Sequence, residues 1–122
     1  MRVAKSDELA AACALYPDAY KRLKIAEPEF RGNVVSRQQL RGRFTFTAAE
    51  LRCYIETNPG LAEVLFDKSL DQRSTPSAFM AEAPGGYTVG WFDHARSEER
   101  FHERIEDAAT DFVLTYWGLP RL

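Results

Sequence analysis

Apolar residues recur three and four positions apart in four separate stretches of the chain, which is the spacing of one helix face. In the first stretch Leu9 and Cys13 follow Ser6, whose hydroxyl is typical of a helix start. In the second, Thr47 and Glu50 form a capping box ahead of the apolar run. The pattern predicts helices near residues 6–16, 47–57, 60–70 and 106–117.

The same spacing predicts which residues of the last three helices face the interior. In the second helix they are Leu51, Tyr54 and Ile55, and in the third they are Leu61, Val64, Leu65 and Leu70. In the last helix they are Ala108, Ala109, Phe112, Val113 and Tyr116. Gly118 and Pro120 are then expected to end that helix, because neither residue continues one.

Three short stretches between residues 78 and 105 are expected to be strands, at residues 78–82, 87–93 and 99–105. The middle one is rich in β-branched and aromatic residues, and Pro84, Gly85 and Gly86 supply a turn before it. The sequence therefore predicts an α+β fold. A small antiparallel sheet over residues 78–105 packs against several helices, including the C-terminal amphipathic helix.

The register of the second hairpin decides how two histidines lie. A two-residue turn at residues 96–97 places Phe92 opposite Phe101 and Trp91 opposite His102. In that register His94 and His102 point to opposite faces of the sheet. Two histidines beside the carboxylate of Asp93 are a candidate set for the acid–base chemistry of a small enzyme or toxin. Their opposite orientation favours surface or structural histidines, and we predict no catalytic residue.

The rest of the chain shows little periodicity. Residues 18–26 are compatible with a second short helix. Residues 27–43 are expected to be loop, with one short element near residues 34–40, and residues 71–77 form a polar loop.

Length and composition indicate one domain over residues 1–122, since 45% of the residues are hydrophobic and 28% are charged. Cys13 and Cys53 both fall in apolar helical patterns, so we expect two reduced core cysteines. The N-terminus carries no apolar leader, and no run approaches the roughly 20 apolar residues of a membrane span. The expected location is the cytoplasm.

Charge is distributed unevenly along the chain. Residues 1–46 carry 9 Lys and Arg against 5 Asp and Glu, whereas residues 47–122 carry 7 against 13. The basic stretch at Arg31, Arg37, Arg41 and Arg43 leaves open a nucleic-acid-binding regulator, although a solvated loop is favoured. No phosphate-binding or zinc-binding motif occurs, and the acidic C-terminal run lacks calcium-loop spacing. No cofactor or metal is therefore predicted.

The C-terminal segment GGYTVGWFDHARSEERFHERIEDAATDFVLTYWGL resembles the ending of small bacterial immunity proteins that accompany polymorphic toxins, including those of contact-dependent growth inhibition. In those endings a strand leads through a turn to a charged strand, and an acid-led helix closes the domain. The matching positions here are Trp91 or Val89, Arg96, Ile105, Glu106, Ala108, Ala109, Phe112, Val113 and Leu114.

The resemblance implies a non-enzymatic inhibitor that binds one toxin domain tightly. The partner is then a protein, the C-terminal domain of a cognate toxin, and neither a nucleic acid nor a membrane. Many such toxins are nucleases, whose basic clefts suit an acidic inhibitor. With Trp117 held back as core, the residues expected to bind the partner are Trp91, Asp93, Glu98, Glu99, Glu103, Asp107 and Asp111.

Overall fold

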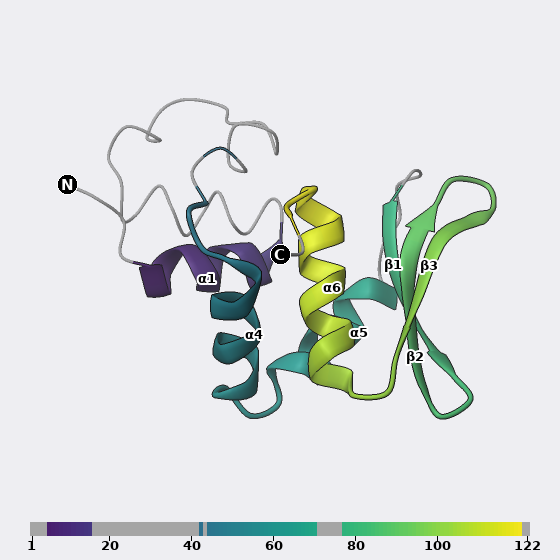
Figure 1. Ribbon diagram of the computed structural model, residues 1–122, viewed down its shortest axis with the longest axis horizontal. Coiled ribbons are helices and arrows are strands. Elements are labelled where there is room, and N and C mark those ends of the chain that lie inside the picture. The colour runs from purple at the N-terminus through teal and green to yellow at the C-terminus, as the bar shows by residue number, and fades with distance from the viewer. Residues whose placement is uncertain (1–4, 16–41, 43, 71–76, 121–122) are drawn as a thin grey trace. The chain divides into compact units, whose positions relative to one another are not determined.

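The computed structural model describes residues 5–15, 42, 44–70 and 77–120. In this part of the chain four helices accompany a three-stranded antiparallel sheet, which confirms the predicted α+β fold (Figure 1). The helices are α1 (Lys5–Ala14), α4 (Ala48–Glu56), α5 (Leu61–Leu70) and α6 (Ile105–Trp117). The strands are β1 (Ser77–Ala83), β2 (Gly86–Phe92) and β3 (Arg96–His102).

The chain clusters into two units, residues 1–47 and residues 48–122. In the first unit α1 stops at Ala14, two residues before the predicted end, and Leu15 takes a left-handed conformation with φ 65°. The Glu8 carboxylate of α1 accepts hydrogen bonds from the backbone N–H and the hydroxyl of Thr45. The predicted helix at 18–26 and the element at 34–40 lie outside the described residues, as do the four arginines of the basic stretch. The expectation of a single domain stays a prediction.

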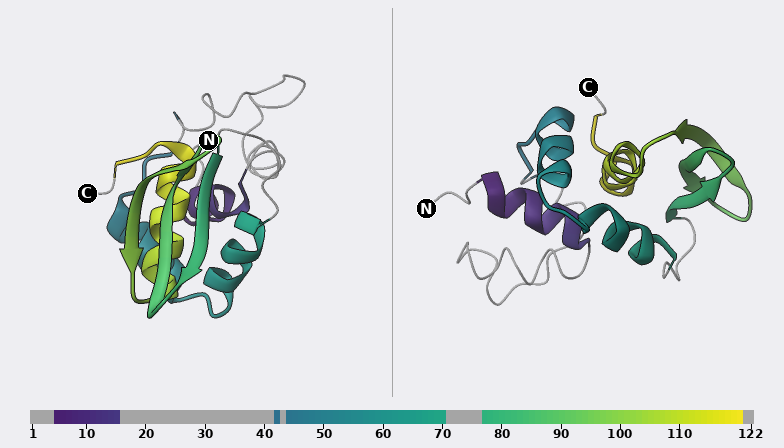
Figure 2. Two further views of the ribbon diagram at one scale, coloured as in Figure 1. Left: turned by 90° about the vertical axis from the view of Figure 1, so that its right-hand side faces the viewer. Right: turned by 90° about the horizontal axis from the view of Figure 1, so that it is seen from below.

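In the second unit the strands form a meander in the order β1–β2–β3. Helix α6 packs against all three strands, α5 packs beside β1, and α4 contacts α6. Both views place α6 between the sheet and α4 (Figures 1 and 2). One face of the sheet is thus covered by helices, and this face is called the inner face below.

Helix α6 forms the centre of the core. Its residues 108–114 are all buried, so every side of two successive turns is covered. Phe112 is fully buried and Tyr116 nearly so, as the periodicity predicted. Met80 and Val89 face them from the inner face of the sheet. Gly118 ends the helix in a left-handed conformation, with its N–H directed at the last carbonyl groups.

Two side-chain placements were predicted wrongly. Cys53 is exposed, because α4 buries Leu51 and Ile55 and a residue midway between them points away from that face. Val64 is 47% exposed, because α5 buries the row that contains Leu65. Leu51, Ile55 and Leu65, which the spacing also placed in the interior, are buried as predicted.

The register of the β2–β3 hairpin also differs from the prediction. The turn is formed by residues 93–95, so that Phe92 pairs with Arg96 and Trp91 with Ser97. His94 adopts φ 65°, and the Asp93 N–H donates to the Ala95 carbonyl at 3.1 Å. The turns that suit a two-residue hairpin loop would require positive φ at Arg96, or at both Arg96 and Ser97, which neither residue type favours. Strand β3 consequently ends at residue 102, and Ile105 begins α6.

Candidate functional site

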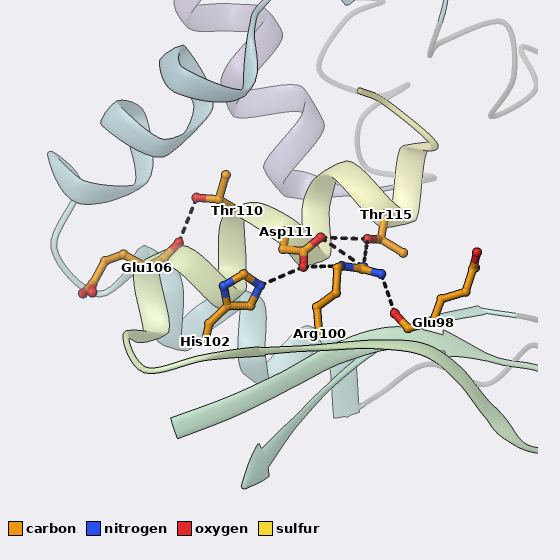
Figure 3. A network of polar contacts seen from close by, with 7 residues as sticks. All are labelled: Glu98, Arg100, His102, Glu106, Thr110, Asp111 and Thr115. Atoms are coloured by element: carbon orange, nitrogen blue, oxygen red, sulfur yellow. Dashed lines mark hydrogen bonds and ion pairs between the residues drawn. The ribbon is translucent and has the colours of Figure 1, made fainter. Parts of the chain in front are cut away.

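A network of polar side chains joins β3 to α6 around the carboxylate of Asp111 (Figure 3). Arg100 Nε donates to Asp111 Oδ2 at 2.7 Å, and Arg100 Nη2 donates to Oδ1 at 3.1 Å. His102 Nε2 lies 2.8 Å from Oδ2, and the Thr115 hydroxyl donates to Oδ1 at 3.1 Å. Arg100 also donates to the Thr115 hydroxyl at 2.8 Å and to the Glu98 carbonyl. Only 6% of the Asp111 side chain is exposed, so this carboxylate is held by partners within the protein.

The periods of the two elements place these groups together. Arg100 and His102 are two residues apart on β3 and therefore point to the same, inner face. Asp111 and Thr115 are four residues apart on α6 and share one side of that helix. An acidic residue amid the apolar residues of a buried helix needs such partners, because an unpaired buried charge is costly.

A pocket of about 350 Å³ opens beside this network, between α4, α6 and β3. On its α4 side Arg52 Nε donates to Asp107 Oδ1 at 2.5 Å, and Arg52 also lies 3.2 Å from the Glu56 carboxylate. The hydrogen bond with Asp107, followed by the attraction of both carboxylates, raises the pKa of Arg52 above its ordinary value. The polar side chains that line the pocket are Arg52, Arg100, His102, Asp107, Thr110 and Asp111.

The pocket offers paired charges and little reactive chemistry. Its two arginines are each engaged by a carboxylate, and the Thr110 hydroxyl donates to the Glu106 carbonyl at 2.8 Å. Among the described residues that line it, none is Ser, Cys or Lys. His94 lies outside the pocket, in the turn at the other end of β3, with a side chain that is 92% exposed. The two histidines therefore lie at opposite ends of β3.

The acidic residues of the hairpin are all exposed. Asp93 lies in the turn, Glu98 and Glu99 lie within β3, and Glu103 follows that strand. Glu98 and Glu99 both stand opposite the single residue Gly90, which makes a β-bulge. Glu98 takes φ 53° at this bulge.

The other predicted partner-binding residues are less accessible. Trp91 is half-buried and pairs with Ala78, on the face of the sheet that carries Val89. Asp107 is engaged by Arg52, and Asp111 belongs to the interior, so we withdraw Asp111 from the predicted docking surface. Trp117 is buried, as expected.

Sequence reasoning missed Arg100 and His102 as the partners of Asp111. The available signal was the position of Asp111 itself, directly before the apolar residues Phe112 and Val113.

Within the part of the chain that the structure describes, no group of three or more His, Cys, Asp or Glu side chains is arranged to hold a metal ion. The described helices are also too short or too polar to span a bilayer. No family model, curated protein or solved structure matches the chain.

Proposed function

We propose that this chain is an immunity protein, which neutralises a cognate bacterial toxin domain by stoichiometric, non-catalytic binding in the cytoplasm. The toxin domain is proposed to be a nuclease. The proposal starts from the resemblance of the C-terminal segment to the endings of immunity proteins.

The observation that carries the proposal is the group of exposed carboxylates on the β2–β3 hairpin, made up of Asp93, Glu98, Glu99 and Glu103 and called the acidic hairpin below. Three of the four have no described arginine or lysine within salt-bridge distance; Glu99 lies 3.9 Å from Arg96. Carboxylates that are exposed and little neutralised attract a basic surface over a distance of about one Debye length.

A nuclease presents such a basic surface, because its cleft binds phosphates. In the proposed mechanism the acidic hairpin accelerates the encounter and occupies basic side chains that otherwise contact nucleic acid. Inhibition then requires complementary surfaces and no bond-making step, in keeping with the absence of a predicted catalytic residue.

The test is co-expression with the toxin domain encoded beside this gene. The wild-type chain is expected to protect cells from that domain and to co-purify with it in equal amounts. Failure to protect cells, or failure to co-purify, would contradict the proposal whatever the fold.

A charge-reversal pair tests the role of the acidic hairpin. Glu98→Lys with Glu99→Lys is expected to slow association, and the loss should shrink as salt is added. Glu63→Lys with Asp67→Lys is the matched control, because it makes the same charge change at two exposed positions of α5. Equal slowing by both pairs would assign the effect to net charge instead of the hairpin.

The contact between His102 and Asp111 at the pocket favours a second candidate, a small enzyme that uses His102 in acid–base chemistry. The engagement of Asp111 by Arg100 and Thr115 favours a structural role instead. His102→Gln keeps a hydrogen-bonding side chain and removes imidazole acid–base chemistry. Loss of the biological effect in a folded His102→Gln variant would support the enzyme, whereas an unchanged effect supports the inhibitor.

A further inference from the structure

The face of the sheet opposite α6 carries aromatic side chains from all three strands. Phe79 is half-buried, Phe92 is 37% exposed and Phe101 is 52% exposed. The pairing register places them on one side, since Phe79 pairs with Gly90 and Phe101 with Thr88. Among the described helices of the second unit none covers this face, which lies on the side of the sheet away from α6 (Figure 2). These three residues are called the outer aromatic face below.

Two glycines of β2 fix the rings against the sheet. A Cβ atom added at Gly90 would lie 2.9 Å from Phe79 Cε1, and one added at Gly86 would lie 2.9 Å from Phe101 Cζ. Both rings therefore lie over bare backbone, in the manner of aromatic side chains that cover a glycine on a neighbouring strand. The Arg96 guanidinium carbon lies 4.8 Å from the centre of the Phe79 ring, which adds a cation–π contact. Because these aromatic rings already lie in fixed positions against the sheet, they lose little conformational entropy when a partner binds.

The edge of β3 is a poorer site for a partner. An added strand needs a regular row of free N–H and C=O groups. The bulge at Glu98 and Glu99 breaks that row, and the Glu98 carbonyl already accepts from Arg100. Bulges and charged side chains on edge strands oppose strand addition. A partner that approaches β3 is therefore expected on the face of the sheet and not at this edge.

The charges beside the outer aromatic face indicate which partner fits. Asp93 follows Phe92 directly in the turn, and Glu103 comes two residues after Phe101. Glu99 lies on the same face, 3.9 Å from Arg96. A second copy of this chain would bring these carboxylates close to identical ones, which costs binding energy. A surface with an apolar centre and a rim of Lys and Arg would complement them.

We propose that the outer aromatic face is the docking surface for the toxin domain, and that it contacts an apolar patch of that domain bordered by basic side chains. The inference rests on the proposed function and adds to it the position and the chemistry of the contact. Phe101 and Phe92 are the anchors, because exposed aromatic residues that become buried dominate interface energies. Asp93, Glu99 and Glu103 form the rim and contribute mainly to the rate of association.

The test measures binding of purified wild-type and variant chains to the catalytically inactivated toxin domain from the neighbouring gene, by titration calorimetry. Phe92→Ala and Phe101→Ala are each expected to weaken binding at least about tenfold. Val64→Ala is the matched control, since Val64 is exposed to a similar extent on α5, and its affinity is expected to match wild type. Circular dichroism establishes that each variant is folded.

The outcomes separate the two proposals. If the wild-type chain binds and both Phe variants bind equally well, the docking surface is wrong and the proposed function stands. If the wild-type chain does not bind, both proposals fall. Analytical ultracentrifugation of the free chain supplies the remaining outcome: a dimer that Phe101→Ala dissociates would show that a second copy covers this face, and would overturn the inference.

Discussion

Replacement of Asp111 by Asn tests whether the polar network at β3 and α6 stabilises the fold. The two Asp111 carboxylate oxygens each face two groups: Oδ1 faces Arg100 Nη2 and Thr115, and Oδ2 faces Arg100 Nε and His102. Whichever way the amide is turned, its NH₂ group meets an Arg100 N–H, which then has no acceptor. The guanidinium also loses its buried counter-charge.

The expected loss follows from the burial of this pair. Removal of one partner from a buried ion pair costs about 3–5 kcal/mol. Because about a quarter of the Arg100 side chain stays exposed, we expect the lower end, about 3 kcal/mol. Asp107→Asn is the control on the same helix: its partner Arg52 is exposed, so the expected cost is about 0–1 kcal/mol. Urea unfolding monitored by circular dichroism gives both values.

A double variant tests whether the cost of Asp111→Asn comes from leaving the Arg100 charge without its partner. Arg100→Met with Asp111→Leu removes both charges. Its loss of unfolding free energy should therefore be smaller than the sum of the losses of Arg100→Met and Asp111→Leu measured singly. Equal costs for Asp111→Asn and Asp107→Asn, or a cost below about 1 kcal/mol for the former, would refute the reasoning.

Four further substitutions test the packing, each by urea unfolding. Phe112→Ala should cost roughly 3–5 kcal/mol because the side chain is fully buried, and a loss below about 1 kcal/mol would contradict its place in the core. Leu65→Ala should cost about 2–5 kcal/mol and its exposed neighbour Val64→Ala less than about 1 kcal/mol, and the reverse order would contradict the burial of Leu65 and the exposure of Val64. Gly90→Ala should cost roughly 1–3 kcal/mol, since its Cβ would lie 2.7 Å from the Ser97 carbonyl oxygen, and a neutral result would show that the bulge yields easily.

The sequence predicted the elements of the second unit because their signals are local. The buried residues of α6 repeat at helical spacing, and the turn between β1 and β2 carries Gly85 at φ 81°. The β2–β3 register was missed because its turn uses His94, rather than glycine, in the left-handed conformation. The bulge opposite Gly90 then shifts the pairing once more. Neither the turn at His94 nor the bulge opposite Gly90 leaves a strong sequence signal, since several residue types can occupy such turns and bulges.

The acidic run of the C-terminal segment shows why the candidate site was predicted only in part. In the sequence the acidic residues follow one another closely. In the fold, side chains alternate between two faces along β3 and turn with a period of 3.6 residues around α6. Folding therefore directs Asp111 into the core and Asp107 toward Arg52, and leaves Glu98, Glu99 and Glu103 exposed.

A partner consequently meets a smaller and more localised negative surface than the composition implies. If electrostatic steering acts through that surface, charge reversal at Glu98 should slow association, whereas neutralisation of Asp107 should leave the association rate nearly unchanged. The two association rates are measured at low salt. Equal losses at the two positions would show that the partner responds to the net charge of the segment and not to which of its carboxylates the fold leaves exposed.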